Sequence, residues 1–257
     1  MTTIGFGNVL RSEWTKLRSV RSTYWTTLFS VLVTIGVGVI VCAKWASDIR
    51  HSPGDTLDPT LASLNGLFLT QVAVGTLGVL VISSEYGTGM IRATFGAVPQ
   101  RRIVLAAKAL VFTAVVLVGG EFLSFTAFGI GQAILHGAHA GASLGQPEVL
   151  RAVVGGGLYL AAVGLLGFGL GALIRHTAGA LSAFFGVLFA LTALADLLPS
   201  SWRNDVIPYM PANAGTQIFS VDRVHDALAP WAGLGVLCLY AAAAITAATV
   251  LVTRRDA

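Results

Sequence analysis

The chain has 257 residues, of which 55% are hydrophobic and only 11% are charged. Soluble domains carry about 25% charged residues, so a soluble fold of this composition would expose large apolar patches. These proportions exclude an ordinary soluble protein and predict an all-α integral membrane protein. The formal net charge of +4 does not indicate a nucleic-acid partner, because basic residues outside the spans are also what membrane orientation requires.

Residues 1–21 predict an amphipathic helix rather than a signal peptide, since the apolar run after them has full span length and lacks a small-residue cleavage site. Apolar residues recur at helical spacing, and Trp14 is suited to the headgroup region. We expect an interfacial helix, although packing on a neighbouring loop is an alternative. The apolar positions are Phe6, Val9, Leu10, Trp14, Leu17 and Val20.

Six apolar segments reach the roughly 20 residues needed to cross about 30 Å of hydrocarbon. The third is too long for one crossing, so we expect it to tilt, to kink near Gly119 or to extend into water. No segment between spans is long enough for a separate soluble domain, so residues 1–257 are predicted to form one membrane domain. The spans are Tyr24–Ala43, Leu64–Ser83, Ile103–Leu135, Ala152–Ile174, Thr177–Leu198 and Trp231–Thr253.

The distribution of lysine and arginine predicts that both termini lie in the cytoplasm. With six spans, eleven basic residues fall on the side of the termini and five on the other side, and the excess marks the cytoplasmic side. The eleven are Arg11, Lys16, Arg18, Arg21, Arg92, Arg101, Arg102, Lys108, Arg175, Arg254 and Arg255. The five are Lys44, Arg50, Arg151, Arg203 and Arg223.

Sequence motifs for chemistry are missing. A P-loop needs a glycine before its lysine, and none of the three lysines follows one. His136 and His139 have no evident third ligand, whereas metal sites need three or four. We therefore expect no enzyme activity, no cofactor and no metal site.

Glu121 lies within the third span, where a charge costs at least about 2.5–3.5 kcal/mol. It is interpreted as a residue of the transport path or of a gate; the alternatives are a hydrogen-bonded structural glutamate and a glutamate that lies nearer the surface. Gly167 and Gly171 have the spacing of a close helix contact, either between two subunits or, as we favour, within one chain. Residues 199–229 contain aromatic and turn residues, which predict a partly buried external cap with a short helix at Ala214–Val221.

The segment between the second and third spans is polar and ends in basic residues. It runs Glu85-Tyr86-Gly87-Thr88-Gly89-Met90-Ile91-Arg92-Ala93-Thr94 and continues to Pro99-Gln100-Arg101-Arg102. Met90, Ile91 and Phe95 form one apolar side, with Arg92 and Glu85 available for polar contacts. Such a short amphipathic helix suits a groove in a soluble partner protein. The alternative is a basic inner loop without further function.

Together with this topology, the motifs resemble those of the permease subunits of ABC type-2 transporters, which are exporters. Glu85–Thr94 resembles the coupling helix of the family, and Arg101-Arg102 its basic turn. Arg11–Ser19, with Glu13, Trp14, Lys16 and Arg18, resembles the "elbow" helix, and Pro208–Gly215 resembles the external segment before the last span. Gly87 departs from the pattern, since relatives often carry a basic or polar residue there.

The resemblance implies a multi-pass protein of the plasma membrane that exports an amphiphilic or hydrophobic compound. ATP would be bound by a separate ABC ATPase subunit, and a second permease subunit, identical or homologous, would face the first and fifth spans. The residues that would couple to the ATPase are Glu85, Tyr86, Gly87, Thr88, Met90, Ile91 and Arg92. An ion-coupled secondary transporter that uses Glu121 is the alternative, while a membrane enzyme would need a cluster of catalytic side chains that the spans lack.

Overall fold

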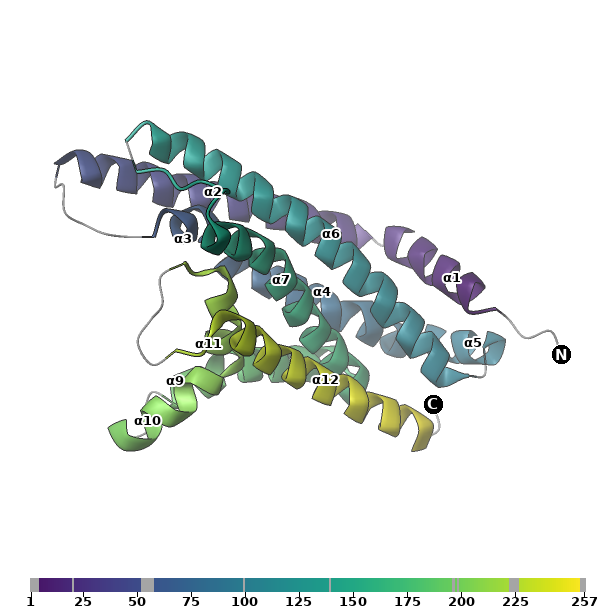
Figure 1. The fold of residues 1–257 in the computed structure, drawn as a ribbon. Coiled ribbons are helices and arrows are strands. Elements are labelled where there is room, and N and C mark those ends of the chain that lie inside the picture. Colours follow the sequence, from purple (N-terminus) through teal and green to yellow (C-terminus); the bar gives the residue numbers. More distant parts are fainter. Residues whose placement is uncertain are drawn as a thin grey trace.

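The computed structural model describes residues 5–19, 21–51, 58–98, 100–138, 140–195, 197, 199–221 and 227–254. All regular elements in these ranges are helical, and six helices are long and apolar enough to cross a membrane (Figure 1). The candidate spans are Thr23–Ile49, Leu67–Gly87, Arg101–His136, Pro147–Ile174, Thr177–Ala195 and Pro230–Val252.

The helices in chain order begin with α1 (Phe6–Ser19), α2 (Arg21–His51), α3 (Pro59–Leu64), α4 (Leu67–Gly87), α5 (Met90–Ala97), α6 (Arg101–His136) and α7 (Pro147–Ile174). The fifth span comprises α8 (Thr177–Phe185), the π-helical turn η1 (Gly186–Ala190) and α9 (Leu191–Ala195). The connection to the last span holds α10 (Ser200–Val206), η2 (Ile207–Tyr209), α11 (Pro211–Thr216) and η3 (Gln217–Phe219), and α12 covers Pro230–Arg254.

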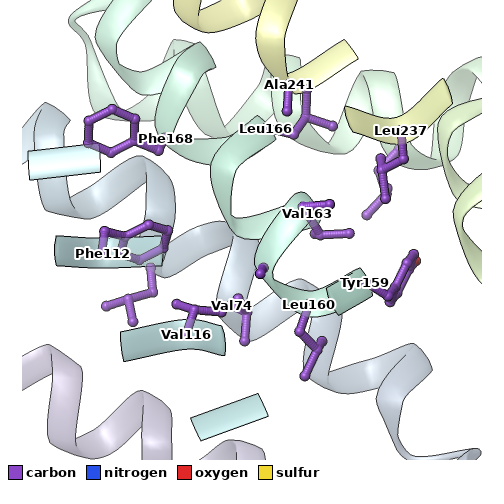
Figure 2. Packing of buried hydrophobic residues seen from close by; sticks show 14 of the residues in the cluster. Val74, Phe112, Val116, Tyr159, Leu160, Val163, Leu166, Phe168, Leu237 and Ala241 are labelled. Carbon is purple, nitrogen blue, oxygen red and sulfur yellow. The ribbon is translucent and has the colours of Figure 1, made fainter. Parts of the chain in front are cut away.

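Helix α7 is the centre of the bundle. In the most apolar stretch of α7, 78% of the residues are buried, whereas in the most apolar stretch of α2 only 22% are buried. Figure 2 shows side chains of α7, among them Leu160, Val163 and Leu166, packed between those of neighbouring helices. Phe112 of α6 stacks on Phe168 with ring centroids 6.1 Å apart. An apolar helix that is covered on nearly all sides must form the core, because its neighbours supply its whole environment.

Glycines of α7 allow this close packing. A Cβ atom on Gly167 would lie 2.2 Å from the carbonyl oxygen of Gly75, and one on Gly171 would lie 2.9 Å from that of Val79. Both contacts are with α4 of the same chain, so this small-residue face is used within one subunit. Close backbone approach through small residues is a common way to pack helices in lipid.

The spans differ from the predicted segments mainly at their polar ends. Helix α2 continues past Ala43 to His51, and α6 is one continuous helix of 36 residues. At 1.5 Å per residue α6 is about 54 Å long, which exceeds the hydrocarbon thickness. Hydropathy detects only the apolar part of such a helix. The second span begins at Leu67 rather than at Leu64, because the break at Asn65-Gly66 separates it from α3.

The two ends of the bundle carry different structures. We call the end that holds α1, α5 and the last turn of α12 the α5 end (Figure 1). There, the Arg101 guanidinium donates to the carbonyl oxygen of Val252 at 3.2 Å. The opposite end, called the α3 end, holds α3 and α11.

At the α3 end, the segment between α9 and α12 packs into the bundle. Ile218 and Phe219 are fully buried, and the Phe219 ring meets Tyr159 edge-on at 5.2 Å. Arg151 donates to the carbonyl oxygens of Ile218 and Ser220, each at 2.9 Å. Trp202 and Tyr209 remain exposed. The expected helix at Ala214–Val221 is instead the pair α11 and η3, which ends at Phe219.

Candidate functional site

The site begins at the turn between α4 and α5. Helix α4 ends at Gly87, and Thr88 closes it by donating from its backbone N–H and its hydroxyl to the Ser84 carbonyl oxygen, at 3.0 and 2.9 Å. Gly89 then adopts a left-handed conformation with φ of 73°, which favours glycine because it lacks a Cβ. This residue allows α5 to start at once in a new direction.

Helix α5 has a buried side and an exposed side. Ile91 is buried, whereas Met90 is 46% exposed and Arg92 is exposed. Thr94 is half-buried, and its hydroxyl accepts a hydrogen bond from the Lys16 Nζ of α1 at 3.3 Å. The helix is therefore held against the bundle on one side and presents the other side outward.

Four charged side chains from three helices form a buried ion cluster beneath α5. Lys16 Nζ donates to Glu13 Oε1 at 2.8 Å and to Glu85 Oε1 at 3.2 Å. Lys108 Nζ donates to Glu85 Oε1 at 2.8 Å and also to Glu13 Oε2. The side chains of Glu13, Glu85 and Lys108 are at most 4% exposed, and that of Lys16 is 28% exposed. We call these four residues the charge cluster.

The environment of Lys16 favours its charged form. Burial alone lowers the pKa of its ammonium group, but the hydrogen bonds and negative charges of Glu13 and Glu85 outweigh burial and raise this pKa above its usual value. The stabilisation from these pairs is therefore fully present below the ordinary lysine pKa. It is lost only as the pH rises through the raised value.

The charge cluster joins α1 to the rest of the molecule. Glu13 and Lys16 belong to α1, Glu85 to α4 and Lys108 to α6. Removing one partner from a buried ion pair typically costs about 3–5 kcal/mol, because the other charge stays buried without compensation. The cluster therefore resists separation of α1 from α4 and α6.

This arrangement corrects one expectation. Glu85 was predicted to be available to a partner protein, but it is 3% exposed and ion-paired inside the bundle. In the first helix Val9 and Leu17 are buried together with Glu13, while Phe6 and the expected interfacial anchor Trp14 are exposed. The helical spacing did not predict that Glu13 would be buried beside the apolar residues.

The other predicted residues lie around the cluster. Arg18 is exposed, and Gly87 is exposed, with no atom of the described residues within 4 Å of an added Cβ. Tyr86 is half-buried, with the Arg175 guanidinium 5.2 Å from its ring centroid. Arg175 lies in the turn between α7 and α8 with a positive φ of 60°. Its contact with Tyr86 brings this turn to the end of α4.

A cavity of about 240 Å³ lies beside the charge cluster. Helices α1, α2, α4, α5 and α6 all contribute to its wall. It is lined by Glu13, Lys16, Leu17, Thr23, Leu80, Val81, Ser84, Glu85, Met90, Lys108, Val111 and Phe112.

Glu121 is separate from this site. It lies thirteen residues after Lys108 on the same helix, about 20 Å along the axis. Its side chain packs against Gly157 of α7, where an added Cβ would lie 2.5 Å from the carboxyl carbon. Its Oε2 atom is buried and has no hydrogen-bond partner in the described part of the chain. No group of three or more His, Cys, Asp or Glu residues suited to a metal occurs in that part.

The sequence did not identify Lys108 and Thr94 as residues of the site. A lysine within an apolar span is itself a signal, because such a residue needs a partner. The identity of the partners was not predictable, since Glu13 is 95 residues away along the chain.

No family model matches the chain, and no curated protein sequence matches it either. Its functional interpretation therefore depends on the residues and their geometry.

Proposed function

We propose that the chain is the membrane-spanning permease subunit of an ATP-driven exporter of the ABC type-2 group. A separate ATPase subunit would supply the energy, and α5 would be the contact through which the ATPase acts. The cargo would be an amphiphilic or hydrophobic compound. Both termini and α5 would lie in the cytoplasm of a cell whose plasma membrane the protein spans.

The observation that carries the proposal is the two-sided character of α5. A helix of eight residues follows a span directly through Gly89, with Ile91 inward and Met90 and Arg92 outward. An exposed methionine and arginine are typical of protein interfaces. A span joined rigidly to such a helix can transmit a displacement of the helix into the membrane.

The charge cluster supports the transmission step. Glu85 is two residues before the end of α4, and Lys108 is on α6, the span that follows α5. Lys16 of α1 contacts both Glu85 of α4 and Thr94 of α5. A force on α5 would therefore reach α1, α4 and α6 together. In this proposal Glu85 transmits the movement inside the permease and Arg92 contacts the ATPase.

The surface of the bundle is compatible with a second permease subunit. In the most apolar stretch of α2 and in that of the fifth span, only 22% of the residues are buried. They expose large apolar side chains, including Trp25 and Phe29 of α2 and Phe189 of η1. Such faces contact lipid or another subunit, and the proposal assigns part of them to a homodimer or heterodimer.

The test measures whether the permease binds an ATPase encoded by the neighbouring reading frame and stimulates its ATP hydrolysis. Arg92→Glu should weaken binding of this ATPase at least about tenfold and abolish stimulation of its ATP hydrolysis, because it reverses an interfacial charge. Affinity and hydrolysis would be measured with the permease in lipid nanodiscs.

Arg203→Glu is the matched control, because Arg203 is also an exposed arginine on a short helix but lies far from α5 (Figure 1). It should leave binding and stimulation unchanged. Equal behaviour of the two variants would contradict the assignment of α5 as the contact.

Ion-coupled transport through Glu121 is the second candidate, because its buried Oε2 atom has no hydrogen-bond partner within the described ranges of the chain. Glu121→Gln would then abolish transport, and collapse of the ion gradient would stop it. The permease proposal expects instead that a catalytically inactive ATPase stops transport while collapse of the gradient does not.

A further inference from the structure

The cavity beside the charge cluster combines an apolar wall with a polar end. Leu17, Leu80, Val81, Val111 and Phe112 line it together with the charged residues. At about 240 Å³ it is far larger than the space one water molecule needs. A molecule with an apolar part and one polar end fits such a lining better than bulk water does.

Two polar atoms of cavity-lining residues are buried and have no hydrogen-bond partner among the residues that the structure describes. They are Oε2 of Glu85 and Oγ1 of Thr23. A carboxylate oxygen accepts only, so Glu85 Oε2 requires a donor, whereas a threonine hydroxyl both donates and accepts. Because unsatisfied buried polar atoms are costly and rare, the pair points to a ligand that carries hydroxyl groups.

The charge balance decides which kind of head group fits. Glu13 and Glu85 carry two negative charges, and Lys16 and Lys108 carry two positive charges, so the charge cluster is neutral as a whole. A cationic or anionic head group would add an uncompensated charge to a buried site, which is unfavourable. An uncharged head group adds none.

We propose that this cavity binds one neutral amphiphile with a hydroxylated head group, of the kind found in a monoacylglycerol. Its hydroxyl groups hydrogen-bond to Glu85 and Thr23, and its acyl chain lies along Leu80, Val111 and Phe112. Since Lys16, Leu17 and Met90 also line the cavity, the bound molecule contacts α1 and α5 as well as the spans. The inference does not depend on the proposed function, because the two atoms that would hold the head group, Glu85 Oε2 and Thr23 Oγ1, are buried in this chain whether or not α5 contacts an ATPase.

The test uses the purified full chain in phosphatidylcholine nanodiscs, because that head group has no hydrogen-bond donor. Three photoreactive probes with the same diazirine-labelled chain carry a glycerol, a carboxylate or an amine head. We expect saturable labelling of peptides containing Leu80 and Val111 by the glycerol probe, and competition by unlabelled monooleoylglycerol. The two charged probes should label these peptides at least about tenfold less.

Thr23→Val and Thr27→Val form a matched pair on α2. The Thr27 hydroxyl already donates to the Thr23 carbonyl oxygen at 2.8 Å, and Thr27 does not line the cavity. Thr23→Val should weaken binding of the glycerol probe about two- to tenfold, the range for one hydrogen bond, while Thr27→Val leaves it unchanged. Equal labelling by all three probes, no saturable labelling, or equal effects of the two variants would overturn the proposal.

Discussion

At the scale of single residues, Lys108 has the most demanding environment in the charge cluster. Its ammonium group donates to Glu13 and to Glu85, and its side chain is only 4% exposed. Within the described residues it is the one lysine whose side chain is this deeply buried. Both carboxylates therefore depend on it for compensation of their charge, although Lys16 contributes from the more exposed side.

Replacing Lys108 by methionine should lower the free energy of unfolding by about 3–5 kcal/mol, because Glu13 and Glu85 stay buried with one cation fewer. The measurement is the thermal unfolding of the purified protein. Lys44→Met is the control, since Lys44 is exposed on α2, and it should change stability by less than about 1 kcal/mol. Adding Glu85→Gln to Lys108→Met should restore part of the loss. An equal effect of the Lys44 and Lys108 variants would show that the cluster does not stabilise the fold.

At the scale of helices, the contact between α4 and α7 organises the bundle. Gly78 and Gly167 remove side chains where the two backbones meet, since an added Cβ at either position would lie 2.2 Å from a carbonyl oxygen of the other helix. Backbone atoms cannot move aside as a flexible side chain can. The contact therefore depends on glycine at these positions rather than on hydrophobicity.

Gly167→Ala should force α4 and α7 apart and destabilise the protein by about 1–3 kcal/mol, as overpacking of a core does. Gly129→Ala on α6 is the matched control in another span, because nothing lies within 4 Å of its added Cβ. It should be neutral or slightly stabilising, since alanine favours a helix. Thermal unfolding and the yield of folded protein report both variants. A stable Gly167→Ala protein would mean that the contact is looser than the structure shows.

At the scale of the whole molecule, the two ends of the bundle differ in charge and in structure. The α5 end carries α1, α5 and the last turn of α12, and Arg92 and Arg102 are exposed there (Figure 1). The α3 end is covered by α11 and the buried residues Ile218 and Phe219. The excess of basic residues predicts that the α5 end faces the cytoplasm.

Cysteine labelling tests this orientation. In a background with Cys42→Ala and Cys238→Ala, single cysteines would replace the exposed residues Arg92 and Asn204. A membrane-impermeant maleimide added to intact cells should label the cysteine at 204. It should label the cysteine at 92 only after permeabilisation. The reverse pattern would place the termini and α5 outside the cell and remove the basis for an ATPase contact.

Much of the fold followed from local sequence features. Each span was found because its apolar residues are continuous, and the start of α5 coincided with the glycine that its left-handed turn favours. The predicted ends of α2 and α4 were less accurate, because hydropathy does not detect the polar turns by which a helix extends beyond its apolar run. The polar segment after the second span was recognised from the sequence, but the Glu85 side chain, which was expected to be available to a partner, is buried in the bundle.

The order of the residues was enough to predict a helical protein with six segments able to cross a membrane and a polar segment between the second and the third. These properties depend on residues that are neighbours in the sequence. A run of about 20 apolar residues is enough to predict a span, whatever the rest of the chain does. The packing of the helices was needed to show that α7 is central and that four charged residues meet, namely Glu13, Lys16, Glu85 and Lys108. The reason is physical: a buried charge selects its partners by proximity after packing, and the partners here are up to 95 residues apart.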